Sequence, residues 1–598
     1  MAKILWLDLN SSYSHSSLAL PALHAQLGGD AGWEWSVVRA TINEDPGDAA
    51  AKIYAEYPDV IAATCWLFTH EHLMAVLSRT SQLLPEAMII LGGPEFLDDN
   101  EHFLRTNDFV TAVFRGEGEI SVPAWLKCWN DRSHWHEVPG ICWLEGEDYR
   151  DMGLAKSTNS KEKANDFNQL HLPEESRFFS WDKAFVQLET CRGCFNTCKF
   201  CVSGGEKPVR VLPMETVRQR VADIHAHGIR DVRMLDRTFN YDQKRATEML
   251  ELFKSYYPEM HFHLEVHPAL MTDVLKAELA KMPAGLLHVE AGIQSLHQDV
   301  LDTCGRKGSL EASLEGLKYL ASLPNLVVHA DLIAGLPLYH LDQIFEDVKE
   351  LASYRIGEIQ LESLKILPGT RMKAEAEQLG LRYSPQPPYE VLMTNEMSPE
   401  EMKRAMHLSR MLDFYYNTEA WQNVFRDLML SGATVEGKEF MEAFLDHLIS
   451  LSVISTPLSL ERRGVILLEF CRKHLPEFTY AITAAWVEAG ISLKKVPGDP
   501  VFRIKYLQRF IEEEEAEARL KVIYGQEWLP GDVLPGHSGK ADSAEATTWT
   551  RALAPEEAKT LSEKLRIYCL RDADGRPTLF GFNSEQHQPS PVFRAELA

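Results

Sequence analysis

The sequence predicts an α/β protein with a parallel-sheet domain, a partial barrel of six strand–helix units and a mostly helical C-terminal region. Two series of short apolar runs support this prediction, one within residues 1–143 and one within residues 184–385, and helical stretches alternate with the runs in both. A polar segment without periodicity, residues 144–183, separates the two series as a linker would. After about residue 386 the apolar residues recur at helical spacing, so the architecture changes there.

The composition is that of an ordinary globular protein. The 598 residues are 45% hydrophobic and 25% charged, and they are enough for several buried cores. No run approaches the roughly 18 apolar residues of a membrane span, and the first residues lack a signal-peptide pattern. We therefore expect a cytoplasmic protein without a membrane partner. The formal net charge of −26 argues against a nucleic-acid partner.

The first series predicts a Rossmann-like domain over residues 1–143. Its four apolar runs are KILWLDL, DVIAATCW, AMIILGG and FVTAVFRG, and helical stretches such as SLALPALHAQL separate them. Such a rhythm is typical of a parallel sheet covered by helices, in which ligands bind beyond the carboxyl ends of the strands.

The second series predicts a partial barrel over residues 184–385. Its six runs are AFVQLET, DVRMLD, HFHLEVH, GLLHVEAGIQS, LVVHADLIAGLP and IGEIQLESLKILPGT. Helical segments such as METVRQRVADIHAHG lie between them. In barrels of this kind the chemistry takes place at the carboxyl ends of the strands, so we expect a site where these runs end.

Residues 386–525 are predicted to form a helical domain. Ser398, Pro399 and Glu401 provide an N-cap, a first-turn proline and the glutamate of a capping box. Apolar residues then repeat at helical spacing at Met402, Ala405, Leu408, Leu412 and Tyr415. Residues 526–598 are predicted to be a loosely ordered tail with a small hairpin or helix near 560–590.

Four of the ten cysteines lie within eleven residues, in the segment ETCRGCFNTCKFCVSGG. Cys194, Cys198 and Cys201 have the spacing C-x3-C-x2-C directly after a predicted strand, and Cys191 precedes them. In a reducing compartment such a group is typical of a metal site. Four thiolates would close a structural zinc site, whereas three thiolates on a compact loop would hold an iron–sulfur cluster and leave one iron open. Both readings fit the spacing.

The loop and the strand ends that follow it resemble the radical S-adenosylmethionine superfamily. The resemblance implies a [4Fe-4S] cluster on Cys194, Cys198 and Cys201, whose open iron chelates the methionine moiety of S-adenosylmethionine. Because a fourth thiolate would close the cluster, we expect Cys191 to be an accessory or structural thiol. The segment LDRTFNYD resembles the DDTF variant of cobalamin-dependent members, with Arg237 in place of the second aspartate. The positions that the resemblance assigns to S-adenosylmethionine are Phe200, Asp236, Glu265, Gln294, Ser295 and Gly335.

The domain before the barrel resembles the cobalamin-binding class. Its segments LGGPEF and FRGEGE lie at predicted strand ends and match the glycine motifs that approach cobalamin, although turns in a flavodoxin-like domain would also use such glycines. Asn10 occupies the place of the histidine that ligates cobalt in methionine-synthase-type domains, so we expect no histidine ligand. The segment that begins at residue 387 resembles a subgroup whose helical C-terminal domain has no assigned function. The predicted cobalamin-binding residues are Asn10, Ser11, Gly92, Gly93, Pro94, Glu95, Gly116, Glu117 and Gly118.

The resemblance implies an enzyme that attacks an unactivated carbon of a small-molecule substrate with a 5′-deoxyadenosyl radical and transfers a methyl group from methylcobalamin. The alternative with the same cofactors is a cyclisation or rearrangement without methyl transfer. A methylthiotransferase would carry three further N-terminal cysteines at other spacings, and an iron–sulfur electron carrier or sensor would not need the strand-end motifs. A flavodoxin or ferredoxin is implied as the electron donor.

Overall fold

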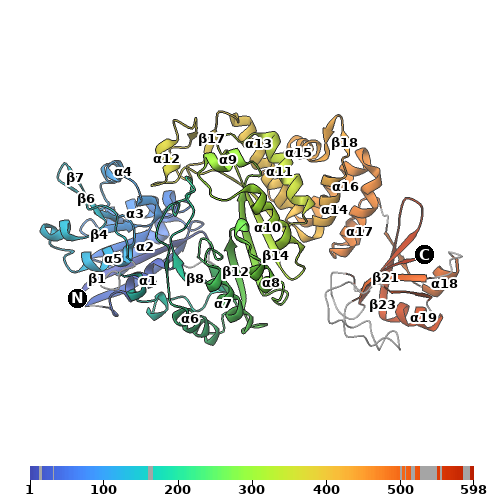
Figure 1. Cartoon of the computed structure of the whole chain (residues 1–598), viewed down its shortest axis with the longest axis horizontal. Helices are drawn as coiled ribbons and strands as arrows, with labels where there is room; N and C mark the ends of the chain where they lie inside the picture. Colours follow the sequence, from blue (N-terminus) through green and yellow to red (C-terminus); the bar gives the residue numbers. More distant parts are fainter. Residues whose placement is uncertain are drawn as a thin grey trace. The chain divides into compact units, whose positions relative to one another are not determined.

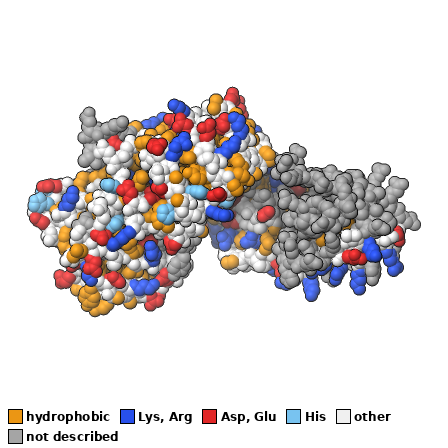
Figure 2. All heavy atoms as spheres, turned by 90° about the horizontal axis from the view of Figure 1, so that it is seen from below, with side chains coloured by type: hydrophobic (Ala, Val, Ile, Leu, Met, Phe, Trp, Pro, Cys, Tyr) orange, Lys and Arg blue, Asp and Glu red, His pale blue; other side chains and the backbone are white. Residues whose placement is uncertain are grey.

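The structure is a computed structural model, and it describes residues 1–12, 17–30, 32–158, 166–498, 501–505, 507–513, 519–525, 549–552, 555–583, 591 and 593–597 (Figure 1). The chain divides into two compact units, residues 1–344 with 361–403 and residues 345–360 with 404–598. None of the helices in the described ranges is both long and apolar enough to cross a membrane. On the face that Figure 2 shows, acidic and basic side chains of the described residues are intermingled.

The N-terminal domain is built on a seven-stranded sheet of order β2-β1-β3-β4-β5-β6-β7. Its strands are β1 (Ala2–Asn10), β2 (Trp33–Thr41), β3 (Val60–Thr64), β4 (Met88–Gly92), β5 (Ala112–Phe114), β6 (Ile141–Glu145) and β7 (Asp148–Asp151). Its helices are α1 (Ala19–Ala25), α2 (Pro46–Glu56), α3 (His70–Leu83), α4 (Glu101–Thr106) and α5 (Gly118–Leu126), with 3-10 turns at η1 (Pro94–Phe96) and η2 (Arg132–Glu137).

Both faces of this sheet are buried, as the continuous apolar runs predict. On β1, Leu5 and Leu7 join one core with α2 and α3, whereas Ile4 and Trp6 join the other with α1 and α5. The first five strands run parallel, and β1 lies between β2 and β3, so the winding direction reverses at β1 and β3. The predicted Rossmann-like arrangement is confirmed. The antiparallel hairpin β6–β7 extends the sheet to Asp151, into the segment predicted as a linker.

The second sheet is the predicted partial barrel, with the order β15-β14-β13-β12-β11-β8. Its strands are β8 (Phe185–Leu188), β11 (Asp231–Met234), β12 (His261–Val266), β13 (Leu287–Gln294), β14 (Val327–Ala334) and β15 (Glu358–Ser363). The helices are α6 (Met214–Ala226), α7 (Gln243–Lys254), α8 (Asp273–Leu279), α9 (Gln298–Thr303), α10 (Leu310–Ser322), α11 (Leu341–Ser353) and α12 (Arg371–Glu375). The short elements are β9 (Cys191–Arg192), β10 (Arg210–Val211), β16 (Arg382–Tyr383), β17 (Val391–Met393), η3 (Phe167–Gln169), η4 (Pro173–Glu175) and η5 (Pro268–Leu270). All six predicted strands are confirmed, in sequence order across the sheet.

The helical region begins at the predicted capping box. The backbone N–H of Ser398 donates to the Glu401 carboxylate (2.8 Å), and the N–H of Glu401 donates to the Ser398 hydroxyl (3.3 Å). The five predicted stripe residues are all buried. The elements are α13 (Pro399–Met411), the π-helical turn η6 (Leu412–Tyr416), α14 (Glu419–Leu430), β18 (Thr434–Val435), β19 (Lys438–Glu439), α15 (Phe440–Ser450), α16 (Leu460–His474), η7 (Pro476–Phe478), α17 (Thr479–Glu488) and η8 (Leu493–Lys495).

The last part of the chain forms an antiparallel sheet of order β20-β23-β24-β25-β21-β22. Its elements are β20 (Val501–Ile504), α18 (Leu507–Glu513), β21 (Arg519–Gly525), β22 (Trp549–Ala552), α19 (Pro555–Lys564), β23 (Leu565–Arg571), β24 (Pro577–Asn583) and β25 (Phe593–Leu597). Residues 501–525, predicted as the end of the helical domain, thus include two strands. Residues 555–583 form a helix and a hairpin, close to the predicted small element, and residues 526–548 lie outside the described residues.

Candidate cluster and cofactor sites

The three predicted cluster ligands lie together on one tightly coiled loop after β8 and β9. Burial raises the pKa of the Cys198 thiol, and Cys194 and Cys201 are close enough to raise it further. A side chain at Gly204 would lie 2.0 Å from the Cys198 carbonyl oxygen, so only glycine permits the loop to close. Three neighbouring cysteine sulfur atoms on one loop are the soft donor set that an iron–sulfur cluster requires, so the residues present fit that group.

Cys191 lies apart from this group. It belongs to β9 and is buried, and burial together with Asp236 raises the pKa of its thiol far above the ordinary range. The charged groups that act most strongly on the Cys191 thiol are Asp236, Arg245 and Glu189. A neutral, buried thiol in this position is suited to packing. The exclusion of Cys191 from the cluster stays a prediction.

Backbone and side-chain bonds from remote segments hold the loop in place. The hydroxyl of Thr197 donates to the Gly305 carbonyl (2.8 Å), and the N–H of Lys307 donates to the side-chain oxygen of Asn196 (2.8 Å). The N–H of Lys199 donates to the carbonyl of Cys304 (2.8 Å). The loop is therefore shaped by the chain itself.

Asp236, predicted to bind S-adenosylmethionine, lies beneath the start of the cluster loop. Only 2% of the residue is exposed. Its carboxylate accepts bonds from the backbone N–H groups of Thr190 (2.7 Å) and Cys191 (2.9 Å) and from the Thr190 hydroxyl. Both carboxylate oxygens thus accept hydrogen bonds from residues at the start of the loop, and these bonds stabilise the conformation of the loop. Its predicted contact with the cofactor stays a prediction.

Of the other residues predicted to bind S-adenosylmethionine, Phe200 lies in the cysteine loop itself, and the rest lie at or just after the ends of barrel strands. Burial raises the pKa of the Glu265 carboxyl to about 7, although Arg237 opposes the shift. Gln294 has a positive φ of 73° beside a bulge in β13, and Ser295 is fully buried. A side chain at Gly335 would lie 2.8 Å from Met402, so here the close approach is to a side chain of this chain. Phe200, next to Cys201, is partly buried.

His267, which follows β12, was not singled out in the sequence. The residue is 4% exposed, its ring lies 5.7 Å from that of Phe195 in the cluster loop, and neither ring nitrogen has a hydrogen-bond partner among the described residues. Burial and nearby Arg306 lower the pKa of His267 to about 3, so the ring is neutral. An unsatisfied polar ring beside the cysteines fits a region where a polar cofactor binds.

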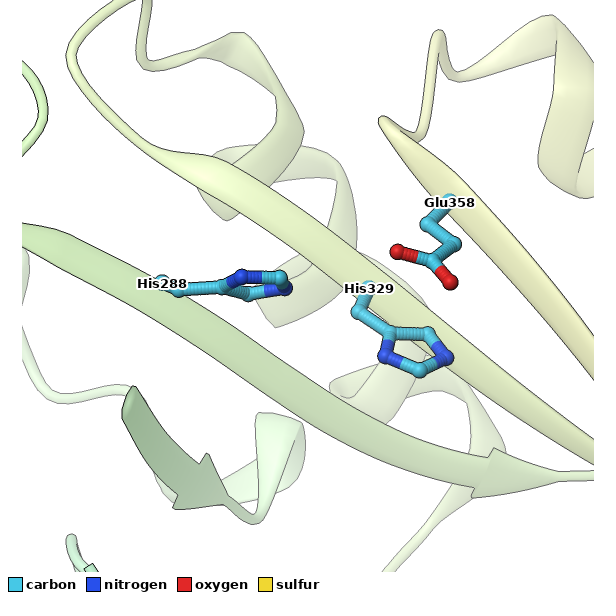
Figure 3. A group of neighbouring side chains, drawn as sticks. All are labelled: His288, His329 and Glu358. Carbon is cyan, nitrogen blue, oxygen red and sulfur yellow. The ribbon is translucent and has the colours of Figure 1, made fainter. Parts of the chain in front are cut away.

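Imidazole and carboxylate side chains lie along the barrel strands, set back from the carboxyl ends. His263 bonds to Glu290 (2.9 Å), and the rings of His263 and His288 are 4.7 Å apart. Burial lowers the pKa of His288 to about 4, and the neighbouring histidines add to the shift. Figure 3 shows His288 on β13, His329 on β14 and Glu358 on β15, three neighbouring strands of the sheet. This part of the barrel is therefore lined by polar groups.

The predicted cobalamin-binding residues lie at the carboxyl edge of the first sheet. Asn10 ends β1, and its side-chain amide donates to Asp8 (2.9 Å), with Ser11 immediately after it. A side chain at Gly92 would meet only Phe114 atoms at 4.0 Å, so the chain leaves this backbone face open. Gly93 follows with a φ of 111° and lies against Cys65, and Pro94 begins η1. An open glycine face beside a strand-order reversal fits a flat macrocycle.

A later segment of the same unit packs on this edge. The hydroxyl of Tyr389 donates to the Glu95 carboxylate, and Lys373 pairs with Asp98 at 3.0 Å. The same segment also contacts the cluster loop, since the Lys199 ammonium pairs with Glu375 at 2.7 Å. Residues 366–389 therefore connect the region predicted for cobalamin with the cysteine loop.

Glu117, also predicted to bind cobalamin, is the centre of a buried ion network. Its carboxylate is 2.8 Å from Arg192 and 2.5 Å from Arg210, and the Arg210 side chain is 1% exposed. Burial acts to raise the pKa of Glu117, but the two arginines outweigh it and the pKa lies below its ordinary value. The further partners of the arginines are Glu119, Glu189, Glu206 and Ser157. The network joins the first sheet to the cluster loop.

The glycines beside Glu117 are held against the chain. A side chain at Gly116 would lie 2.2 Å from the Ala155 carbonyl oxygen, and one at Gly118 would lie 2.9 Å from Leu23. Both therefore serve internal packing at this strand end. Their contact with cobalamin stays a prediction.

Comparison with known proteins gives matches to three families along the chain. The sequence matches the B12 binding domain over residues 7–126, the radical SAM superfamily over residues 188–352 and a protein family of unknown function, DUF4080, over residues 377–484. The first two matches fall on the two parallel sheets, and the third falls on helices α13 to α17 after the barrel.

Curated relatives are distant. The chain is 23% identical over 332 residues to the uncharacterized methyltransferase PH0819 of Pyrococcus horikoshii, covering 54% of this chain and 70% of that protein. It is 22% identical over 346 residues to the cobalamin-dependent radical SAM methyltransferase TokK of Streptomyces tokunonensis, covering 56% and 51%. The ribosomal protein uS12 methylthiotransferase RimO of Clostridium perfringens matches 37% of the chain at 24% identity, and the match covers half of that protein.

Among solved structures, the cobalamin-dependent S-adenosylmethionine radical enzyme OxsB has a similar fold. The TM-score is 0.55 at 14% identity, with 82% of this chain and 81% of that chain covered. The family matches and this fold agree on a radical SAM barrel that follows a B12-binding domain. The chain is a member of the radical S-adenosylmethionine superfamily, with a B12-binding domain before the barrel and a DUF4080 region after it.

Proposed function

We propose that this protein is a cobalamin-dependent methyltransferase that acts on an unactivated carbon of a small-molecule substrate by radical chemistry. The observation that carries the proposal is that one unit of the chain holds both a loop with three neighbouring cysteines and an open glycine edge, linked by the Glu117 network. The similarity to PH0819 and TokK, which are both described as methyltransferases, supports methyl transfer over rearrangement.

The cluster would be held by Cys194, Cys198 and Cys201, and cobalamin would lie against Gly92 and its neighbours. When bound, these groups supply an electron for cleavage of S-adenosylmethionine and a carrier for the methyl group. Oxygen-sensitive chemistry of this kind needs a shielded site. Residues 366–389, which pack on both regions, would help to exclude water there.

The protein's own groups would position the reactants. Asp236 fixes the start of the cluster loop through its three hydrogen bonds, and Arg192 ties the same loop to Glu117. Glu265, whose pKa of about 7 leaves it partly protonated near neutrality, can either donate or accept a hydrogen bond at the barrel mouth. A flavodoxin or ferredoxin would supply the electron.

The test is anaerobic reconstitution with iron, sulfide and cobalamin, followed by incubation with methyl-labelled S-adenosylmethionine, a titanium(III) reductant and a fraction of small metabolites. We expect iron and cobalt in the protein, 5′-deoxyadenosine, and label in a small-molecule product. Deoxyadenosine without transferred label would instead support rearrangement. Absence of cleavage under strong reductant would contradict the enzymatic proposal and favour an electron carrier.

A further inference from the structure

A shallow recess lies beside the cysteine loop. It has a volume of about 430 Å³ and is lined by Phe195, Lys207, Pro208, Val209 and Tyr241. Phe195 lies between the first two cluster cysteines in the sequence. The N–H of Cys194 donates to the carbonyl of Glu206, the residue before Lys207 (3.2 Å). Most of the lining is apolar, so the recess is an apolar surface close to the cluster loop.

Two positive charges flank this recess. Lys207 and Lys307 are both exposed, and their ammonium groups are close enough that Lys307 lowers the pKa of Lys207. The loop of Lys307 is fixed to the cluster loop by the bond from its N–H to Asn196. The nearby carboxylate of Glu206 is already paired with Arg210.

Neither lysine has a carboxylate within ion-pair distance among the residues that the structure describes. Two adjacent ammonium groups repel each other, so the pair is suited to an anionic partner. This local positive charge stands out in a chain whose net charge is −26.

We propose that this recess is the docking surface for an acidic, flavodoxin-class electron carrier. The inference rests on the proposed function, which requires one electron at the cluster. The carrier's flavin hydroquinone would be oxidised by one electron and the cluster would accept that electron, with no bond broken. A flavin presents a planar ring edge that an apolar recess can receive, whereas the acidic surface around it would meet Lys207 and Lys307.

The test measures binding rather than turnover. The reconstituted full-length protein is titrated with oxidised flavodoxin at low and at physiological ionic strength. We expect saturable binding that weakens with salt, and a loss of affinity of about tenfold or more in the variant Lys207→Glu/Lys307→Glu. The control variant is Lys473→Glu/Lys494→Glu, which makes the same charge change at two exposed lysines of the helical region. Equal affinity of both variants would overturn the proposal.

A second measurement separates this inference from the proposed function. Cleavage of S-adenosylmethionine is driven either by reduced flavodoxin or by titanium(III) citrate. The Lys207→Glu/Lys307→Glu variant should lose cleavage with flavodoxin and retain it with the chemical reductant. Loss with both reductants would mean that the lysines support the site itself, which contradicts a docking role. Ferredoxin binding is measured in the same way. If the lysine substitutions weaken the binding of ferredoxin but not that of flavodoxin, the assignment of the carrier is refuted.

Discussion

Replacing Glu117 by glutamine tests whether the buried ion network joins the first sheet to the cluster loop. The side chain is 12% exposed and is shared by two arginines, one of them 1% exposed. Removal of one partner from a buried pair costs about 3–5 kcal/mol. Arg210 would keep Glu206, and Arg192 would keep Glu119 and Glu189, so we expect the lower end, about 3 kcal/mol.

The assay is urea unfolding followed by tryptophan fluorescence, which reports mainly on the first domain because eight of the thirteen tryptophans lie within residues 1–143. The matched control is Glu34→Gln, which removes an exposed pair with Lys3 at 3.6 Å and should cost less than about 1 kcal/mol. Equal losses for the two variants would refute the reasoning.

The same variant has a predicted pH dependence. The pKa of Glu117 is lower in the folded than in the unfolded protein, so its stabilisation is present above the unfolded pKa of 4.5 and disappears as the pH falls through the folded pKa. The difference in unfolding free energy between the parent protein and Glu117→Gln should therefore be constant near neutrality and shrink in acid. A free-energy difference that grows in acid would contradict a lowered pKa of Glu117 in the folded protein.

Three further predictions concern the cofactor sites. Cys191→Ser should keep the full iron content of the reconstituted protein whereas Cys198→Ser should lose it, as measured by metal analysis; loss of iron in the first would make Cys191 a ligand. Gly204→Ala should prevent cluster assembly because its methyl group would lie 2.0 Å from a carbonyl oxygen. Gly92→Ala, by contrast, should fold normally, keep its iron and bind cobalamin more weakly in an equilibrium titration. The protonated carboxyl band of Glu265 should fade in infrared spectra as the pH rises through about 7 and be absent from Glu265→Gln, and a titration near 4 would contradict its burial.

The parallel strands could be predicted because each one is buried on both faces and therefore appears as a continuous apolar run. Strand β2 was not singled out, since WEWSVVRAT at the edge of the sheet alternates between apolar and polar residues. The C-terminal sheet was missed for a different reason. Its strand β21 pairs with β25, more than sixty residues later, and antiparallel pairing of this kind is set by distant partners that no local pattern records.

The cysteine loop could be predicted because its three ligands are close in sequence. The hydrogen-bond and ion-pair partners of the carboxylates that hold the loop, Asp236 and Glu117, could not be predicted. Asp236 bonds to Thr190, 46 residues away, and Glu117 reaches Arg192, 75 residues away, and Arg210, 93 residues away. The motifs predict cofactor contacts for both acids from residue type and strand end alone. The bonds of Asp236 depend on the pairing of β8 with β11 in the barrel sheet, and the ion pairs of Glu117 depend on how the first domain packs against the cluster loop.

Neighbouring residues of a motif can therefore have different roles: a glycine can leave space for a ligand while an acidic residue nearby stabilises the fold. Gly92 leaves a backbone face open to a ligand, whereas Glu117 pairs with two arginines and Gly116 packs against the Ala155 backbone of the same chain. A residue that is satisfied internally resists rearrangement, because freeing a buried carboxylate from two arginines costs several times the thermal energy. The open backbone face and the three cysteines are thus places where cofactors can gain contacts, and the ion network fixes their relative position.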